Sequence, residues 1–594
     1  MRLERVVLHS RRLCFTSLAI LTLSTSPMRA LAACKLAKMA ELPVTMNNLR
    51  PVITAKVNGR DARFVVDSGA FFSMISEASA AQFDLKPTPA PLGLFIKGIG
   101  GAVDPSIATV DVFTFAGIPI HNVQFLVAAG LGRTENAGLL GQNFFRIGDV
   151  EYDLGKGMIR LMRAKGCENA TLAYWVKPSE SYSLMDIEAA TPQSAHIAGT
   201  ALINGEKIRV IFDTGAPTSL LSLKAAERAG VKPESQGVVD AGYGGGIGRN
   251  RIRTYVGPFS SFKIGDEEIL NTRLRFADLG LEDADMLIGA DFFLSHRIYV
   301  ANSQHKLYFT YNGGPVFDLT SRSGNPEDDK AADEPADAAA YSRRGTAFAA
   351  RRDFAHAIAD LTRACDLDSR NPEYFYQRGI VYRDNNQAEL ALADFDRTLD
   401  LKSDDLPALV ARAQLRLRAR DIAGATTDLG AADRAASKED DIRLFLARGY
   451  QDADLLPASI AQYDRWIAAH DGDPRMPDAL NGRCWARALQ GQELAAALSD
   501  CNTALKLSAK QSPMSASVLN SRGLVRLRLG DYDKSIADYD DALKLAPKSA
   551  WSLYGRGVAE MRRKRVPQGQ SDIAAATAIR ASVEDEFKRR GIIP

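Results

Sequence analysis

The sequence predicts a multidomain chain in which two β-rich lobes, each a small closed barrel of short strands, precede an all-α solenoid. Three observations lead to this fold class. One pattern of residues occurs twice in the first half, a polar and acidic stretch follows it, and the second half repeats alanine-rich amphipathic helices about every 34 residues. A chain of 594 residues has room for several domains with cores of their own.

The pattern that occurs twice surrounds one aspartate in each copy. Residues 65–70 read VVDSGA and contain Asp67, and residues 211–216 read IFDTGA and contain Asp213. An Asn-Gly pair lies nine residues before each aspartate, and an apolar-apolar-Gly segment ends at Gly141 and at Gly289. A single aspartate of this kind could merely cap a turn. Two copies in register favour a duplicated unit with one acid per lobe.

Paired carboxylates on matching units predict acid–base chemistry. Two carboxyl groups in contact cannot both ionise at low cost, so they share a proton, and one can activate a water while the other polarises a carbonyl. The neighbouring hydroxyls can fix the two loops, and the glycines let the backbone approach closely. These supporting residues are Ser68, Gly69, Thr214 and Gly215.

At these residues the chain resembles the retropepsin-like bacterial aspartic proteases, over roughly residues 40–312. Ser76 and Ser222, nine residues after each aspartate, add to the resemblance. It implies Asp67 and Asp213 as catalytic residues, a peptide or protein substrate, and neither a metal nor a cofactor. It also implies glycine-rich flaps over the substrate, for which the candidates are Gly98, Gly100, Gly101, Tyr243, Gly244 and Gly245. The family's usual form has one lobe per chain, whereas this chain carries both.

The N-terminus predicts export. Basic residues precede an apolar run from Leu13 to Leu23, and the small residues at 30–32 are typical of a signal-peptide cleavage site. We therefore expect a periplasmic or secreted protein. Export allows a disulfide between Cys34 and Cys167, which bracket the first lobe. Residues 31–34 also match a bacterial lipoprotein box, so a lipid anchor at Cys34 is the alternative. No later stretch is long and apolar enough to span a bilayer.

Charge and metal-ligand patterns exclude other classes. The net charge of +2 gives no indication of binding to nucleic acid or to an acidic membrane surface. The seven histidines are scattered, and neither CxxC nor HExxH occurs, so the sequence predicts no metal centre.

The expected domains follow from these boundaries. They are a signal peptide at 1–32, lobe 1 at 33–168, an inter-lobe linker at 169–190, lobe 2 at 191–316, an acidic linker at 317–340, the solenoid at 341–582 and a tail at 583–594. One short helix is expected in each lobe, over Glu77–Phe83 and Lys224–Gly230. The acidic linker predicts that the lobes and the solenoid fold independently.

In the second half, an arginine followed by a small residue recurs from Arg344-Gly345 to Arg556-Gly557, at spacings of 34, 34, 36, 35, 39 and 34 residues. This period resembles the tetratricopeptide repeat and predicts about seven helix pairs, the fourth irregular, with a groove for a protein partner. Six of the arginines precede an aspartate 16 or 17 residues later, and the fourth repeat has Gln462 instead. This predicts a structural salt-bridge ladder; the alternative is an arginine-lined groove for acidic peptides.

Two details of side chains stay open at this point. Cys484 and Cys501 occupy facing positions of one repeat, where they could form a disulfide or be two small buried residues. Cys365 has no obvious partner. Phe71 and Phe72 stand where the second lobe has Pro217 and Thr218, and we expect core packing for them rather than the wall of a substrate pocket.

The function that fits these features is an exported, acid-favouring aspartic endopeptidase whose repeats recruit a protein substrate or partner. Two alternatives remain. The lobes could form a non-catalytic scaffold for protein–protein interaction, or they could form dyads only by dimerisation in trans. Contact between Asp67 and Asp213 within one chain would favour an internal dyad.

Overall fold

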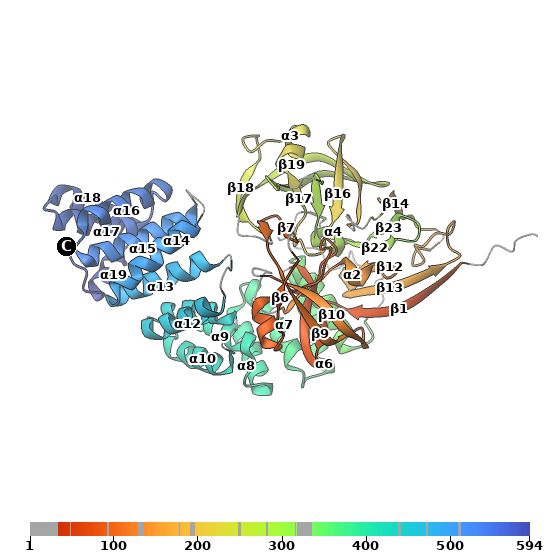
Figure 1. Ribbon diagram of the computed structural model, residues 1–594, viewed down its shortest axis with the longest axis horizontal. Helices are drawn as coiled ribbons and strands as arrows, with labels where there is room; N and C mark the ends of the chain where they lie inside the picture. The colour runs from red at the N-terminus through yellow and green to blue at the C-terminus, as the bar shows by residue number, and fades with distance from the viewer. Residues whose placement is uncertain are drawn as a thin grey trace, which may run out of the picture.

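The computed structural model describes residues 34–47, 49–91, 94–128, 136–177, 179–189, 196–246, 251–280, 283–314, 316–317, 335–437, 441–470, 473, 475–508 and 512–594. The predicted signal peptide lies outside these residues. Figure 1 shows two β-rich lobes in red to green, followed by a helical array that runs away from them to the C-terminus in blue. The fold class predicted from the sequence is confirmed.

Lobe 1 is an eight-stranded sheet that curls until β3 also pairs with β9, which closes it. The strand order is β2-β3-β4-β11-β5-β10-β9-β6. Every second residue at the end of β3 is buried, as expected for a strand with one face on the core. The strands are β2 Thr45–Asn47, β3 Arg50–Val57, β4 Arg60–Val66, β5 Met74–Ser76, β6 Thr88–Pro89, β9 Ser106–Phe115, β10 Ile118–Ala128 and β11 Gly138–Leu140.

Lobe 2 repeats this plan with the order β15-β16-β21-β17-β20-β19-β18, closed by pairing of β15 with β19. Strands β16, β21 and β17 take the places of β4, β11 and β5, as the sequence duplication predicted. The strands are β15 Ala198–Ile203, β16 Glu206–Phe212, β17 Leu220–Ser222, β18 Val239–Gly244, β19 Ile252–Ile264, β20 Glu267–Ala277 and β21 Met286–Ile288.

A six-stranded sheet joins the two lobes, in the order β1-β13-β12-β22-β23-β14. Its central pair brings one strand from each lobe together, with Tyr152 opposite Ile298. The sequence did not predict this sheet, because three of its pairings, β1 with β13, β12 with β22 and β14 with β23, join segments more than a hundred residues apart. The strands are β1 Lys35–Pro43, β12 Asp149–Asp153, β13 Met158–Lys165, β14 Ser183–Asp186, β22 His296–Ala301 and β23 Lys306–Tyr311.

The edge of this sheet carries a disulfide between Cys34, just before β1, and Cys167, just after β13, with their Cα atoms 4.5 Å apart. A lipid anchor would need the same sulfur of Cys34. The segment predicted as an inter-lobe linker contributes β14, so it is part of the body of the protein rather than a free connection.

The short helices of the lobes lie where the sequence placed them. Helix α1 covers Glu77–Gln82 and α3 covers Leu223–Arg228; the hydroxyls of Ser76 and Ser222 accept hydrogen bonds from Ser79 N and Ala225 N and so cap them. Each lobe has a second short helix, which we did not predict because one turn is too short to show periodicity. These are α2 Gln142–Phe145 and α4 Ala290–Ser295.

The solenoid consists of antiparallel helix pairs. Taken two at a time, helices α5 to α18 make the seven expected repeats. A side chain at Gly345 would lie 2.8 Å from Cγ of Leu361, so the small residue after each arginine lets the two helices of a pair approach. The helices are α5 Ala338–Ala350, α6 Phe354–Leu367, α7 Pro372–Asp384, α8 Ala388–Leu401, α9 Leu406–Arg418, α10 Ile422–Ala435, α11 Ile442–Asp452, α12 Leu456–Ala469, α13 Met476–Gln490, α14 Leu494–Leu507, α15 Pro513–Leu529, α16 Tyr532–Leu545, α17 Ala550–Arg562, α18 Val566–Ile579 and α19 Val583–Arg589.

Both ends of the solenoid differ from the prediction. The segment predicted as a tail forms α19, whose buried Phe587 packs on the rings of Trp551 and Tyr554 and covers the last repeat. At the other end, α5 packs on the lobes. Ala347 is fully buried in the core cluster of the lobes, and Arg351 donates a hydrogen bond to Gly313 O at 3.2 Å. The first repeat is therefore anchored to the lobes, contrary to the expected independence.

The predicted salt-bridge ladder is confirmed. In each of six repeats the guanidinium of the recurring arginine binds both oxygens of its aspartate, as for Arg412 and Asp428 at 3.0 and 2.6 Å. The arginine-lined groove is wrong, because these guanidinium groups are engaged within their own repeats. In the fourth repeat, Gln462 instead accepts a hydrogen bond from Arg443 at 2.7 Å. The six pairs are Arg344–Asp360, Arg378–Asp394, Arg412–Asp428, Arg483–Asp500, Arg522–Asp538 and Arg556–Asp572.

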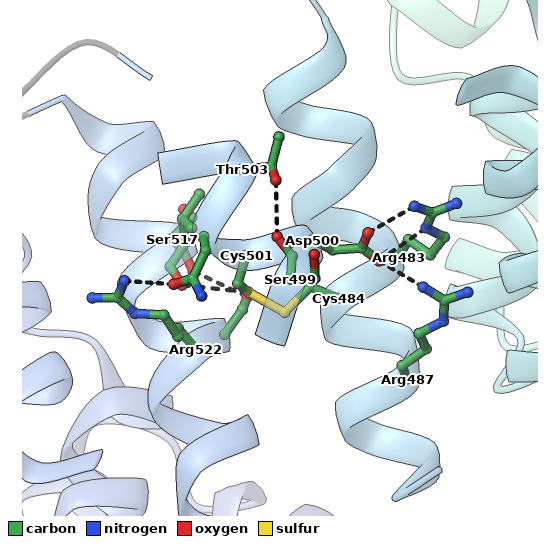
Figure 2. Close-up of a disulfide and its surroundings, with 12 residues drawn as sticks. Arg483, Cys484, Arg487, Ser499, Asp500, Cys501, Thr503, Ser517 and Arg522 are labelled. Carbon is green, nitrogen blue, oxygen red and sulfur yellow. Dashed lines mark hydrogen bonds and ion pairs between the residues drawn. A yellow bond between two sulfur atoms is a disulfide. The ribbon is translucent and has the colours of Figure 1, made fainter. Parts of the chain in front are cut away.

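Figure 2 shows the fifth repeat, where a disulfide joins Cys484 of α13 to Cys501 of α14 beside Asp500 and its two arginines. Both half-cystines are fully buried, so the bond links the two helices across their packed faces. Cys365 is a free, buried thiol, and burial raises its pKa to about 11.

Candidate active site between the two lobes

Each candidate acid sits where a strand of its lobe ends. Asp67 follows β4 and Asp213 follows β16. The apolar-apolar-Gly segments form β11 and β21, which run parallel to those strands. Asp67 N donates to Leu140 O at 2.9 Å, and Asp213 N donates to Ile288 O at 2.8 Å. The neighbouring strand therefore fixes the backbone of each acid.

The two loops interlock through their hydroxyl residues. Ser68 N donates to Oγ1 of Thr214 at 3.0 Å, and Thr214 N donates to Oγ of Ser68 at 2.9 Å. Each hydroxyl then donates across the interface, Ser68 to Phe212 O at 2.9 Å and Thr214 to Val66 O at 2.7 Å. Both side chains are fully buried, so this reciprocal set orients the two loops symmetrically.

The carboxyl groups of the two acids face each other. Oδ1 of Asp67 accepts from Gly69 N at 3.0 Å and Ala70 N at 2.8 Å, and Oδ1 of Asp213 accepts from the equivalent amides of its own loop. A side-chain atom at Gly69 would overlap the carboxyl group of Asp213, and one at Gly215 would overlap that of Asp67. Glycine is therefore required at both positions for the acids to approach, and the pair forms within one chain.

The surroundings of the acids favour a shared proton. Burial, and then the charge of Asp213, raise the pKa of Asp67 well above its usual range. Burial also raises the pKa of Asp213, although the hydrogen bond from Asp67 opposes this shift. Burial and the contact between the two carboxyl groups thus favour one proton shared by the pair. Both side chains remain partly accessible to solvent.

The flaps predicted from glycine-rich segments are hairpins. In lobe 1, β7 Ile96–Gly98 pairs with β8 Gly101–Val103, so Gly98, Gly100 and Gly101 lie at or beside the turn. Ile99 at this turn packs against Ala198, Ile211 and Leu287 of lobe 2. In lobe 2, Tyr243 and Gly244 belong to β18, which pairs with β19; Gly245 follows β18, and Gly246 lies beside Ile99. The two flaps therefore meet.

Both lobes match the family model described as aspartyl protease, over residues 53–144 and 199–292. The two lobes are aspartyl protease-like domains. A model described as tetratricopeptide repeat matches residues 520–583, and the helical half is a tetratricopeptide repeat array.

Among curated proteins, the chain is 24% identical over 193 residues to a Dictyostelium discoideum protein described as DnaJ homolog subfamily C member 7 homolog. The alignment covers 32% of this chain and 30% of that protein. Among solved structures, it is similar to a tetratricopeptide repeat protein from Parabacteroides merdae, with 14% identity, a TM-score of 0.34, and coverage of 42% of this chain and 97% of that one. The APC/C hetero-tetramer Cut9-Hcn1 gives 17% identity, a TM-score of 0.32, and coverage of 42% and 48%.

The protease lobes contain a second pair of matched clusters that we did not predict. In lobe 1, Ser73 donates to Oδ1 of Asn143 at 2.8 Å and accepts from Gly141 N at 2.9 Å. In lobe 2, Ser219 donates to Asp291 at 2.6 Å and accepts from Gly289 N at 2.9 Å. These clusters tie the loop after each aspartate to the segment after β11 or β21. Their register was visible in the sequence, since both serines lie six residues after the aspartate.

Three other residues support the site without a sequence signal. Gln142 donates to Ser68 O at 2.8 Å, and Arg50 donates to Gly215 O at 3.1 Å. His196 lies near enough to Asp213 for the carboxylate charge to oppose the lowering of the imidazole pKa by burial. Each of these comes from a different part of the chain, so only the fold brings them to the dyad.

The expected core position of Phe72 is wrong. Its ring packs on Phe71 with the centroids 4.4 Å apart, yet 45% of its surface is exposed. Within the described residues there is no group of three or more histidine, cysteine, aspartate or glutamate side chains that could hold a metal. Nor does the described part of the chain contain a helix long and apolar enough to cross a membrane.

Proposed function

We propose that this protein is an exported aspartic endopeptidase that hydrolyses peptide bonds with an intramolecular dyad, and that its repeats recruit the protein substrate. The observation that carries the proposal is the opposition of Asp67 and Asp213 in loops held together by Ser68 and Thr214. Two disulfides are consistent with an oxidising compartment and support the predicted export.

The shared proton gives the two acids distinct roles, because one carboxyl group is protonated while the other is ionised. The protonated carboxyl group donates a hydrogen bond to the scissile carbonyl oxygen, and the ionised one accepts a proton from a water held between the two acids. The water oxygen adds to the carbonyl carbon, and the C–N bond then breaks as the amine receives a proton from the dyad. Loss of the shared proton removes the hydrogen bond to the carbonyl, so activity falls as the pH rises through the raised pKa of the pair.

The test uses purified full-length protein with an unfolded protein substrate. We expect Asp67→Asn and Asp213→Asn each to lower kcat/KM by roughly a thousandfold or more, because neither acid can act without the other. Wild-type activity should be highest below neutral pH. Asp84→Asn is the matched control, because its side chain is 85% exposed and pairs with Arg60 rather than with the dyad.

Thermal unfolding of the variants establishes that the lobes remain folded. Near wild-type turnover in either dyad variant would refute the proposal, as would wild-type activity that is unchanged between pH 4 and pH 8. Intact mass of the exported chain tests the location: we expect a start near Ala33 and two disulfides, whereas a diacylglycerol adduct on Cys34 would establish the lipid anchor.

A further inference from the structure

Arg50 and His196 occupy equivalent positions in the two lobes. Each stands two residues before a strand residue whose partner on the next strand lies two residues before the aspartate of that lobe. The two pairs of opposite strand residues are Val52 with Val65 and Ala198 with Ile211. The duplicated fold therefore places one basic side chain of each lobe near the two acid loops, which are residues 67–70 and 213–216.

Arg50 reaches the acid loop of the opposite lobe. Its Nε donates a hydrogen bond to Gly215 O at 3.1 Å. This carbonyl belongs to the same peptide group as Ala216 N, which donates to Oδ1 of Asp213 at 3.2 Å. Hydrogen bonds in a chain polarise one another, so a cation at the oxygen strengthens the N–H that faces the carboxylate. Arg50 thus acts on Asp213 through one peptide group.

His196 has the same relation to the acid loop of lobe 1. Its imidazole lies beside the backbone of Gly69, and the hydrogen bond between them favours the charged ring. A charged imidazole only donates, so the partner is the carbonyl group of Gly69. The same peptide group carries Ala70 N, which donates to Oδ1 of Asp67 at 2.8 Å. Burial raises the pKa of Asp213, and the charge of the nearby His196 opposes that shift.

The two basic side chains differ in how their charge depends on pH. A guanidinium stays charged in proteins, whereas an imidazole gains and loses its proton near neutrality. Burial lowers the pKa of His196, and the charges of Asp213 and Asp283 oppose this shift. The ring lines a cleft of about 610 Å³ in lobe 2, so its proton exchanges with solvent. One acid loop therefore has a permanent cation beside it, and the other has a cation only in acid.

The other charged groups around His196 leave its surroundings weakly acidic. Arg209, which acts against protonation of the ring, binds Glu188 through Nε and Nη2 at 2.7 Å each. Arg228 binds Asp285 at 2.8 Å. The charged side chains of the cleft that remain are Lys224, Asp278 and Asp283. Two carboxylates therefore outweigh one ammonium group, and the cleft tolerates a charged imidazole.

We propose that Arg50 and His196 are positioning residues of the dyad, and that each holds the acid loop of the other lobe through one peptide group. Arg50 supports Asp213 at every pH, whereas His196 supports Asp67 only while the imidazole is protonated. This rests on the proposed function for the reaction that the dyad performs. A chain with both lobes permits the division, because each lobe carries its own basic residue at the equivalent position.

The test follows the shared proton of the dyad without cleavage of any peptide. The reagent is phenyl glycidyl ether, applied to the full-length protein. An ionised carboxylate opens its epoxide to form an ester, and the alkoxide that results takes the proton of the neighbouring carboxyl group. The rate therefore rises with pH as the pair loses its first proton and falls as it loses the second. Intact mass measures the adduct, and peptide mapping places it on Asp67 or Asp213.

The variants should move the two limbs of this pH–rate profile differently. We expect Arg50→Gln to raise both the acid and the alkaline limb by about one pH unit, because removal of a cation raises the pKa of nearby carboxyl groups. His196→Gln should raise the acid limb alone, because the imidazole is already neutral at the alkaline limb. His196→Arg should lower the alkaline limb, since it supplies a charge there. Arg60→Gln is the matched control, because Arg60 pairs with Asp84 at 3.1 Å.

Conservative variants distinguish positioning from a purely structural role. Arg50→Lys keeps the charge and should keep both limbs near their wild-type positions. Arg50→His should raise the alkaline limb and leave the acid limb in place, and it answers the question if Arg50→Gln does not fold. Unchanged limbs in folded Arg50→Gln or Arg50→His would overturn the proposal. A shift of both limbs by His196→Gln would overturn the division between the two residues, and so would the absence of esterification at every pH.

These outcomes are separable from those for the proposed function. A chain whose esterification shows the expected limbs, yet which cleaves no unfolded protein, would refute the protease function and leave the positioning role established. A chain that cleaves protein with the same pH profile in wild type, Arg50→Gln and His196→Gln would refute the positioning role alone.

Discussion

The matched clusters around Ser73 and Ser219 differ in one side chain, since lobe 2 has the carboxyl group of Asp291 where lobe 1 has the amide of Asn143. Asp291 accepts hydrogen bonds from Ser219 and from Phe292 N, but no positive charge compensates it in its buried position. Burial therefore raises its pKa to about 7, in spite of those hydrogen bonds. Asn143 makes the equivalent contacts with Ser73 without any charge.

This difference predicts the behaviour of Asp291→Asn. The folded state holds a proton on Asp291 up to about pH 7, whereas the unfolded chain releases it near pH 4. The stabilisation is complete below the unfolded pKa and is lost as the pH rises through the folded pKa. We expect the variant to gain stability relative to wild type between pH 4 and pH 7, by on the order of 1 kcal/mol or more at pH 8. Denaturant unfolding at several pH values measures this; parallel stability curves for the two proteins would contradict it.

At the scale of helices, the ladder joins the two helices of six of the seven repeats through buried ion pairs. Asp428 of α10 is fully buried and accepts from both Arg412 and Arg416 of α9. Arg412 also contacts Asp396 of the preceding repeat at 2.6 Å, but that aspartate is 54% exposed. The same arginine therefore makes one buried and one solvent-screened ion pair.

This pairing predicts that replacing Asp428 lowers the free energy of unfolding far more than replacing Asp396, although both aspartates bind Arg412. Asp428→Ala leaves two guanidinium groups without their buried carboxylate, and we expect a loss of about 3 kcal/mol in the free energy of unfolding. Asp396→Ala should cost less than about 1 kcal/mol, because water screens that pair. Chemical denaturation followed by helix circular dichroism compares them. Equal losses would mean that the ladder does not stabilise through burial.

At the scale of the whole molecule, the first repeat is packed on the two lobes. Ala347 of α5 lies in the same core as the lobes, and Arg343 of that helix packs so closely on Gly157 that a side chain there would overlap it. The solenoid thus extends from a fixed base, which places α13 and α15 opposite the lobe 2 flap (Figure 1).

This attachment predicts where the chain can be cut. A chain that ends at Phe317 loses α5 and exposes the part of the core that α5 covers. We expect the Tm of its lobes to lie several degrees below that in the full-length protein, which corresponds to a loss of about a few kcal/mol in the free energy of unfolding. A chain that ends at Asp368 keeps α5 and α6 and should melt like the lobes of the full-length protein. Calorimetry of both measures this. Identical melting of the two truncated chains would show that α5 contributes nothing to the lobes.

The sequence by itself determined the repeated units. Asp67 and Asp213 stand in matching loops, and Arg412 stands 16 residues before Asp428, because each unit obeys the same local rules of strand, turn and helix packing. Because the units are duplicated, the same residues recur at equal spacings, and these spacings can be read from the sequence. The short helices α1 and α3 were predictable for the same reason, since a serine cap precedes each of them.

Only the tertiary structure decided what lies between the units. The shared six-stranded sheet, the contact of α5 with the lobes, and a cleft lined by β18 and Asn481 all bring together residues more than a hundred positions apart. The repeats in the sequence do not predict such contacts, because each contact depends on the shapes of two surfaces that belong to different units. Gln142, Arg50 and His196 reach the dyad in this way, and so does the opposition of the two acids themselves.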